Sequence, residues 1–143
     1  MSGTLCCHRL QRNAMPIADN ADWLIPPRMI RCRFMHRIAP EDRDVHDPAA
    51  GEGNVLVSAA ERQQLKNLLQ LGLSDSFRLF EQPAKPYTWW DYRKMAFRRN
   101  MGMRIDHILI SEPLVAHCKS CVIDKAPRKL ERPSDHTPVV VEL

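Results

Sequence analysis

The sequence contains no apolar run that approaches the ~20 consecutive residues needed by a membrane-spanning helix. Its N-terminus lacks the basic start and the continuous apolar stretch of a secretory signal peptide. Internal repeats and low-complexity segments are also absent. These absences argue against a membrane protein, a secreted protein and a repeat protein, so we expect a cytoplasmic protein. The apolar fraction of 44% and the charged fraction of 27% are typical of a globular chain.

Cysteine is too irregularly placed to indicate a metal site. Cys118 and Cys121 form a single Cys-x-x-Cys. A second group near the N-terminus comprises Cys6, Cys7, His8, Cys32 and His36. Because the spacing between the groups is long and irregular, the sequence argues against a zinc site. In the cytoplasm the five thiols are expected to be reduced.

Most of the chain lacks an excess of positive charge. Residues 1–37 carry six arginines and two aspartates, whereas residues 38–143 carry 15 basic and 15 acidic side chains and are neutral as a whole. Any contact of residues 38–143 with a polyanion must therefore come from local clusters. One cluster comprises Arg93, Lys94, Arg98, Arg99 and Arg104, and the other comprises Lys125, Arg128, Lys129 and Arg132.

Two interpretations of these basic clusters are open from charge alone. They are either solvated loop charges or contacts to a nucleic-acid backbone. Three aromatic residues beside the first cluster favour the second interpretation, because they suit stacking on bases or sugars; they are Trp89, Trp90 and Tyr92.

The pattern of apolar and turn residues predicts one clear helix and several strands. Ser58 and Glu61 form a capping box, and leucines at helical spacing follow until Gly72. A further turn is expected over 75–80, and a short helix is expected to start near Pro113. Strands are expected over residues 87–90, 104–111, 120–124 and 138–142. One helix with these strands predicts one layer pair of a sandwich, with the other sheet absent.

Two short motifs carry groups that suit acid–base chemistry. Asp135 and His136 precede the apolar run that ends the chain, and Asp106 lies upstream in an apolar stretch. A carboxylate beside an imidazole fixes the ring tautomer and raises its basicity, as a general base or a transition-state donor requires. The alternative is a purely structural hydrogen bond. His107 follows Asp106 directly and is expected to point to the opposite face of the strand.

Three segments in this order and spacing carry a family resemblance: Tyr87–Arg93, Phe97–Asp106 and Arg132–His136. Together they resemble the C-terminal part of exodeoxyribonuclease III, from the superfamily that also holds the apurinic endonucleases and phosphatases. The likeness starts near Ile38 and runs to Leu143, less than half of a full-length member. It implies an α/β fold, the C-terminal portion of a four-layer αββα sandwich with a mostly antiparallel sheet and flanking helices. Residues 1–37 are expected to be unrelated or poorly ordered, and a full-length member is expected to be a monomer.

The resemblance also implies roles for individual residues. His136 would face the scissile phosphate as general base or hydrogen-bond donor, and Asp106 would orient it. Asp135 would hold Mg²⁺, with Mn²⁺ as the alternative, directly or through water. The resemblance places several residues on double-stranded DNA at abasic sites or 3′ ends: Trp89, Arg98, Arg99, Asn100 and Met103, with Ile105 near the abasic sugar. Core packing is the alternative for the apolar members of this set, and a turn is the alternative for Asn100.

The part of the family motif that should precede Ile38 has no match. A Gly-Asp-hydrophobic-Asn motif is expected there, and residues 33–37 are Arg-Phe-Met-His-Arg instead. A metal-binding Glu, an early Asn and a Tyr near the phosphate also come from the N-terminal half of family members. The hypothesis that follows is a truncated or frame-slipped gene start. Two functions therefore stay open: a DNA-repair phosphodiesterase (3′→5′ exonuclease and apurinic endonuclease), and a truncated, catalytically inactive fragment with weak DNA binding.

Overall fold

The computed structural model describes residues 4–6, 38–51, 53 and 55–143. The expectation for residues 1–37 falls outside these residues, except for the short strand β1 (Thr4–Cys6). Among the described residues, no helix has both the length and the apolar character to cross a membrane. The fold is a partial α/β sandwich with antiparallel sheets and flanking helices.

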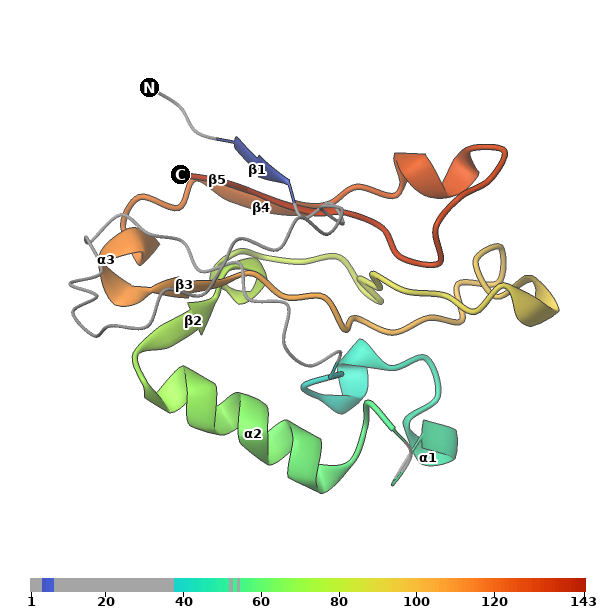
Figure 1. Ribbon diagram of the computed structural model, residues 1–143, viewed down its shortest axis with the longest axis horizontal. Coiled ribbons are helices and arrows are strands. Elements are labelled where there is room, and N and C mark those ends of the chain that lie inside the picture. Colours follow the sequence, from blue (N-terminus) through green and yellow to red (C-terminus); the bar gives the residue numbers. More distant parts are fainter. Residues whose placement is uncertain (1–3, 7–37, 52, 54) are drawn as a thin grey trace, which may run out of the picture.

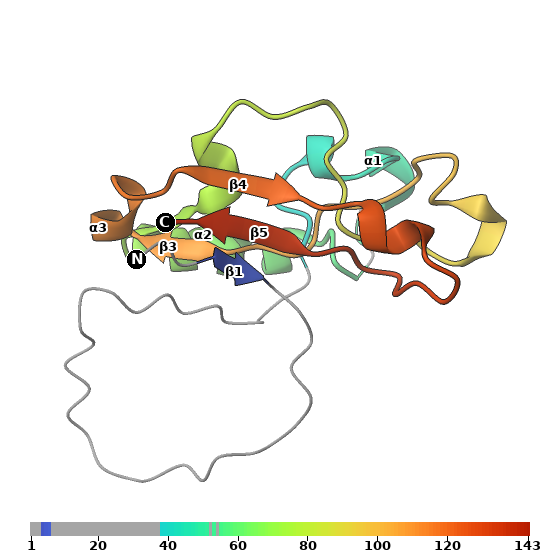
Figure 2. The ribbon, with the colours of Figure 1, turned by 90° about the horizontal axis from the view of Figure 1, so that it is seen from above.

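The strands divide between two sheets. One sheet has the order β1-β5-β4, with β4 spanning Ser120–Ile123 and β5 spanning Val139–Glu142. The other pairs β2 (Leu73–Asp75) with β3 (Leu109–Ser111). Every pairing is antiparallel. Figure 1 shows the β1-β5-β4 sheet above the β2-β3 sheet and α2 (Ala59–Gln70) below them both. Figure 2, from above, shows β5 between β4 and β1.

Two expectations about the strands are therefore wrong. We expected a single sheet with the other sheet of the sandwich absent. The described strands instead form parts of two facing sheets. Regular strand also covers less of the chain than its apolar pattern indicated. Of the stretch 104–111 only Leu109–Ser111 is a strand, and of the stretch 87–90 only Trp89 forms isolated bridges. The buried apolar residues of both stretches are covered by side-chain packing in the core clusters and not by neighbours in a continuous ladder.

Helix α2 begins where the capping box placed it. The Ser58 side chain accepts from the backbone N–H of Glu61, and the Glu61 carboxylate accepts from the backbone N–H of Ser58 at 3.2 Å. The helix buries Leu65 and packs against β2, and Gly72, at φ +84°, turns the chain from the helix into that strand. The described residues also form two single-turn α-helices, α1 (Pro48–Gly51) and α3 (Glu112–Val115). Pro113 lies in the first turn of α3, as expected.

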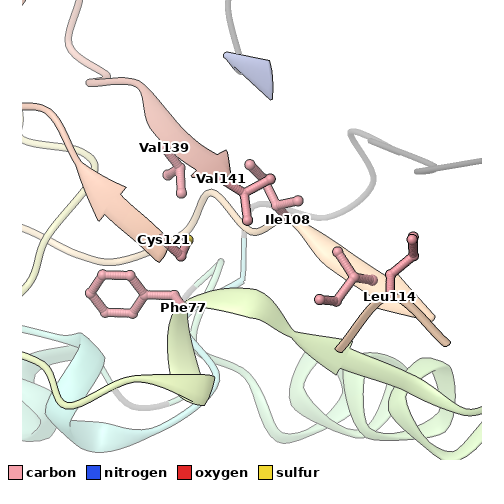
Figure 3. Packing of buried hydrophobic residues seen from close by; sticks show 7 residues of the cluster. Phe77, Ile108, Leu114, Cys121, Val139 and Val141 are labelled. Atoms are coloured by element: carbon pink, nitrogen blue, oxygen red, sulfur yellow. The ribbon is translucent and has the colours of Figure 1, made fainter. Parts of the chain in front are cut away.

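An apolar core fills the space between the two sheets. Val139 and Val141 alternate inward along β5, as a half-buried strand requires. The short 3-10 helix Ser76–Leu79 places Phe77 against them, which confirms the expected extra turn over 75–80. Figure 3 shows these side chains converging with three further members of the cluster, Ile108, Leu114 and Cys121. Ile110 of β3 belongs to the same cluster. Burial of this apolar surface is the main force that holds the layers together.

A buried network of charges lies beside this core. Arg104 is 1% exposed, and it donates to Asp44 at 2.8 Å and to Asp75 at 2.7 Å. Asp44 is fully buried and also accepts from Arg78 at 2.6 Å. Burial alone would raise the pKa of Asp75, but the hydrogen bond to His107 and the charge of Arg104 outweigh it, and the pKa lies well below its ordinary value. Arg104 is therefore a structural cation, and its assignment to a DNA-facing basic cluster is wrong.

Gly102 lies where a side chain has no room. A Cβ there would lie 2.6 Å from the Trp89 carbonyl oxygen and 2.6 Å from Nε1 of Trp90. We expect Gly102→Ala to lower the free energy of unfolding by about 1–3 kcal/mol, because backbone must move to admit the methyl group. Urea denaturation measures this. Gly51→Ala is the matched control, since its Cβ would meet Val57 at an ordinary 3.5 Å. Equal effects at the two glycines would contradict the tight packing at Gly102.

Candidate active site

Three short segments lie side by side and bring the motif residues together. Trp89 forms an isolated antiparallel bridge to Met103 on one side and to His136 on the other. The backbone N–H of Met103 donates to the Trp89 carbonyl at 3.0 Å, and the Trp90 N–H donates to the Asp135 carbonyl at 3.0 Å. The stretch around residue 89 thus holds the stretch around residue 105 against the last loop before β5. This arrangement explains why groups 30 residues apart in the chain can meet.

Asp106 and His136 form a hydrogen-bonded pair within this arrangement. Nδ1 of His136 lies 2.8 Å from Oδ2 of Asp106, and the two side chains are 19% and 14% exposed, in the order His136 and Asp106. With the carboxylate ionised, the ring donates from Nδ1, which leaves Nε2 for chemistry. Nε2 is enclosed and has no hydrogen-bond partner among the described residues. The pairing that the family resemblance implied is present. Its catalytic role stays a prediction.

Asp135 lies next to this pair and contacts Trp89. Nε1 of Trp89 donates to Oδ2 of Asp135 at 3.0 Å, so the indole orients the carboxylate. Trp90 is fully buried, whereas Trp89 is partly exposed, because successive side chains of an extended segment point to opposite sides. His107 points away from the pair, with its Nε2 2.8 Å from the Ile38 carbonyl oxygen.

A carboxylate in this position suits a hard divalent cation. Mg²⁺ is bound by oxygen ligands and usually by only one or two carboxylates together with water and substrate phosphates. The part of the chain that the structure describes holds no group of three or more His, Cys, Asp or Glu side chains placed to bind a metal ion. Asp135 therefore fits as one ligand of a magnesium site that takes its other oxygens from elsewhere. Its metal role stays a prediction.

The cysteines of the Cys-x-x-Cys lie outside this site. Cys121 belongs to the core, and its Sγ is 3.3 Å from Oγ of Ser76. Burial raises the pKa of the Cys121 thiol to about 11 and also raises the pKa of Cys118. Both groups are therefore thiols at neutral pH and poor nucleophiles.

The apolar residues expected on DNA are packed against the protein. Ile105 is 2% exposed and lies in a cluster with Ala39, Val45 and Val57, and Met103 packs against the same cluster. Core packing therefore accounts for Ile105 in the described structure. Met103 is partly exposed, and its DNA contact stays a prediction.

Asn100 occupies a turn. Its φ is +50°, a conformation that asparagine tolerates better than most residues. Its backbone N–H donates to the Phe97 carbonyl at 3.1 Å, and its Oδ1 accepts from Nε1 of Trp90 at 3.3 Å. The turn interpretation thus holds for Asn100, and a phosphate contact by the same side chain stays a prediction.

The basic clusters separate into exposed and buried members. Arg98 and Arg99 are exposed on the loop that follows Tyr92, and Lys129 is exposed on the neighbouring loop. Residues 91–100 and 126–129 lie at the same end of the molecule (Figures 1 and 2). Arg128 is buried like Arg104, since it is 6% exposed and its guanidinium carbon lies 5.0 Å from the Phe97 ring centre. Its assignment to a DNA-facing cluster is therefore wrong.

Arg128 instead joins two loops beside the Asp106–His136 pair. Its guanidinium contacts the rings of Trp90, Tyr92 and Phe97 and donates to the Ser134 carbonyl, one residue before Asp135. Sequence reasoning missed this role because an arginine in a basic stretch looks solvated. It also missed Thr88, which is fully buried between the segments that carry the pair. The one signal in the sequence that could have indicated a buried Thr88 is its position between aromatic residues.

Comparison with known proteins gives one consistent result. The family model described as the endonuclease/exonuclease/phosphatase family matches residues 26–136, a range that begins ahead of Ile38. Exodeoxyribonuclease III of Haemophilus influenzae is 42% identical over 83 residues, which are 57% of this chain and 31% of that protein.

Solved structures agree with the sequence match. A 3′ phosphatase from Neisseria, solved with a product DNA hairpin, has a TM-score of 0.72 and 47% identity, covering 74% of this chain and 41% of that one. An apurinic endonuclease from Archaeoglobus fulgidus has a TM-score of 0.68 and 39% identity, covering 73% of this chain and 41% of that one. The chain thus spans well under half the length of the relatives that it matches.

Proposed function

Because this chain belongs to the endonuclease/exonuclease/phosphatase family, in its exodeoxyribonuclease III and apurinic endonuclease branch, we propose that it carries part of a DNA-repair phosphodiesterase. The reaction is metal-assisted hydrolysis of a phosphodiester in duplex DNA, at abasic sites or at 3′ ends. The observation that carries the proposal is the 2.8 Å hydrogen bond between Asp106 and His136.

The pair supports this chemistry because the second ring nitrogen of His136, Nε2, is not used by the hydrogen bond to Asp106. Asp106 occupies Nδ1 of His136, and Nε2 has no partner among the described residues. A phosphate oxygen or a water at Nε2 would supply that partner once the DNA displaces the atoms that now enclose it. A neutral ring accepts a proton at Nε2, and a protonated ring donates a hydrogen bond from it to developing negative charge. Asp106 supports both roles of the ring: it fixes the tautomer of the neutral imidazole, and it stabilises the imidazolium after a proton is taken up.

The metal is proposed to be Mg²⁺, with Mn²⁺ as the alternative, and Asp135 to be one of its ligands. The carboxylate accepts a hydrogen bond from Nε1 of Trp89, and the backbone of Trp89 forms a bridge with His136. When bound, a divalent cation polarises the phosphate and neutralises charge on it. This chain contributes the Asp135 carboxylate, which Trp89 orients, and the imidazole of His136.

DNA contact is proposed for the end of the molecule that holds the exposed cations. Arg98, Arg99 and Lys129 are exposed there, and Tyr92 presents a 64% exposed side chain. Exposed cations suit phosphates, and an exposed ring suits a sugar or a base. The Neisseria relative was solved with a DNA hairpin, which supports a DNA substrate for this branch.

A second function is favoured by the partial coverage. The chain covers 31% of the Haemophilus relative and 41% of the Neisseria relative, so other groups of a complete family site lie outside the matched part. Loss of members of a catalytic unit can remove nearly all rate enhancement. The chain alone would then bind DNA weakly and leave it uncut.

One experiment separates the two functions. The purified chain is incubated with a duplex that carries a single abasic site, with Mg²⁺ or with EDTA. His136→Ala, purified in parallel, controls for a co-purified host nuclease. Mg²⁺-dependent cutting that His136→Ala abolishes supports the phosphodiesterase. Binding by fluorescence anisotropy without any cutting supports the second function, and the absence of both contradicts DNA action by the isolated chain.

A chimera tests the active-site residues even if the isolated chain does not cut. Residues 38–143 replace the matched region of the Neisseria 3′ phosphatase, whose other residues complete the site. We expect this chimera to cut duplex DNA with Mg²⁺ and to lose that activity with His136→Ala. A folded chimera whose activity does not depend on His136 would contradict the proposed role of the pair.

A further inference from the structure

Thr88 makes hydrogen bonds to every segment that forms the site. It is fully buried and belongs to no helix or strand. Its backbone N–H donates to the Met103 carbonyl at 2.9 Å, and its carbonyl accepts from the N–H of Thr137 at 2.8 Å. Its side-chain Oγ1 accepts from the backbone N–H of Ile105 at 3.0 Å and from that of Asp106 at 3.1 Å.

The hydroxyl acts as a double acceptor for the backbone of Asp106. A threonine oxygen has two acceptor lone pairs, and two successive N–H groups occupy them. Asp106 lies ahead of β3, so its N–H has no place in the ladder between β2 and β3. The Thr88 side chain therefore takes the role that a neighbouring strand would have, and it fixes the backbone from which the Asp106 carboxylate projects.

The backbone of the same residue fixes the other half of the pair. Thr137 directly follows His136 and precedes β5, and its N–H donates to the Thr88 carbonyl. One residue thus holds Asp106 through its side chain and the neighbour of His136 through its main chain.

We infer that Thr88 is a positioning residue that sets the hydrogen bond between Asp106 and His136. Its significance for catalysis rests on the proposed phosphodiesterase function, whereas its effect on the hydrogen bond does not. No contact of Thr88 with a substrate is implied, because Thr88 is fully buried.

Two substitutions isolate the hydroxyl. Thr88→Val keeps the shape of the side chain and removes the acceptor, so two buried N–H groups lose their partner. Thr88→Ser keeps the acceptor and removes only a methyl group. Both variants retain the backbone bonds to Met103 and Thr137, so a difference between them reports the hydroxyl alone.

The direct readout is nuclear magnetic resonance of the Nδ1 proton of His136 in the full chain labelled with ¹⁵N-histidine. The resonance is assigned by its loss in His136→Gln. We expect a low-field, hydrogen-bonded Nδ1 proton in the wild type and in Thr88→Ser, and its loss or upfield shift in Thr88→Val. Urea denaturation and the backbone spectrum establish that each variant is folded. An unchanged Nδ1 proton in folded Thr88→Val would overturn the inference.

A measurement without the valine variant covers the case in which it does not fold. The amides of Ile105 and Asp106 should exchange slowly with solvent in the wild type and in Thr88→Ser, although neither lies in a regular strand. Exchange as fast as that of exposed loop amides would show that the hydroxyl does not hold them.

A kinetic readout separates this inference from the proposed function. In whichever form cuts DNA, the chain or the chimera, Thr88→Val should lower kcat by about 100-fold with KM little changed, because misplacement of a reacting group costs about this much. Thr88→Ser should restore most of the loss. If no form cuts DNA, the proposed function fails while the resonance data still decide the inference. If cutting is normal in Thr88→Val, the positioning role fails while the proposed function stands.

Discussion

Replacement of Asp106 by asparagine is expected to slow phosphodiester cleavage by about 10³- to 10⁴-fold, the size of effect seen when an orienting carboxylate loses its charge. The introduced amide would keep the size of the side chain but could present an N–H to Nδ1 of His136. The ring would then take the opposite tautomer, with its proton on Nε2. A general base needs the lone pair of Nε2 to accept a proton, so this tautomer would be inactive. The amide would also fail to stabilise the imidazolium.

The measurement is the single-turnover rate on an abasic duplex with Mg²⁺, in the chain or in the chimera, whichever cuts. Asp106→Asn, His136→Ala and the double variant are compared, because members of one catalytic unit are not additive. We expect the double variant to be no slower than the slower single variant. Asp42→Asn is the control, since Asp42 pairs with Arg62 outside the stretches proposed to contact DNA, its side chain is 73% exposed, and its loss should leave the rate near that of the wild type. Losses that multiply in the double variant would show that the two residues act separately.

Replacement of Arg104 by methionine is expected to lower the free energy of unfolding by about 3–5 kcal/mol, because it removes a cationic partner from two buried carboxylates at once. Arg104 is 1% exposed and is the residue that joins Asp44 to Asp75. Methionine preserves much of the packing volume, so the loss reports the uncompensated charge. Asp44 would keep only Arg78 as a cationic partner at 2.6 Å.

Urea denaturation at neutral pH gives the free energy for this comparison. Arg93→Met is the matched control, because that side chain is 86% exposed and lies 3.5 Å from Asp91. An exposed pair of this kind contributes about 0–1 kcal/mol. If both substitutions cost the same small amount, the Arg104 network does not contribute to stability in the way that its burial indicates.

The sequence predicted the parts of the fold whose signals are local. The capping box at Ser58, the helix after it, β4 and β5 all depend on residues within a few positions of one another. The meeting of Asp106 with His136 was predicted through resemblance, since nothing local to either residue places it beside a partner 30 residues away.

The sequence did not predict the features that depend on distant partners. Arg104 and Arg128 lie in basic stretches and look solvated until their partners are known. Arg104 meets Asp44 from 60 residues away, and Arg128 lies among aromatic rings of a separate loop. The sequence shows which residues are charged but not which are buried. The number of cations that could reach DNA was therefore overestimated, because Arg104 and Arg128 are buried.

The extent of strand was overestimated for a related reason. Apolar residues at 87–90 and 104–108 have the composition of strands, but the described structure gives the first stretch only isolated bridges at Trp89. The second stretch makes single backbone hydrogen bonds, such as that from the Arg104 N–H to the Asp44 carbonyl. Thr88 supplies part of what a ladder would have supplied, through its hydroxyl. A side chain that replaces strand hydrogen bonds leaves no periodic signal in the sequence.

The most direct test of the account is a crystal structure of the chain, or of the chimera, bound to a duplex with an abasic site and Ca²⁺ in place of Mg²⁺ to prevent cleavage. We predict that Nε2 of His136 lies about 3 Å from an oxygen of the phosphate beside the abasic sugar. Asp106 should still accept from Nδ1 of the same ring. A phosphate bound elsewhere, with Nε2 still turned into the protein, would contradict the claim that this pair acts on DNA.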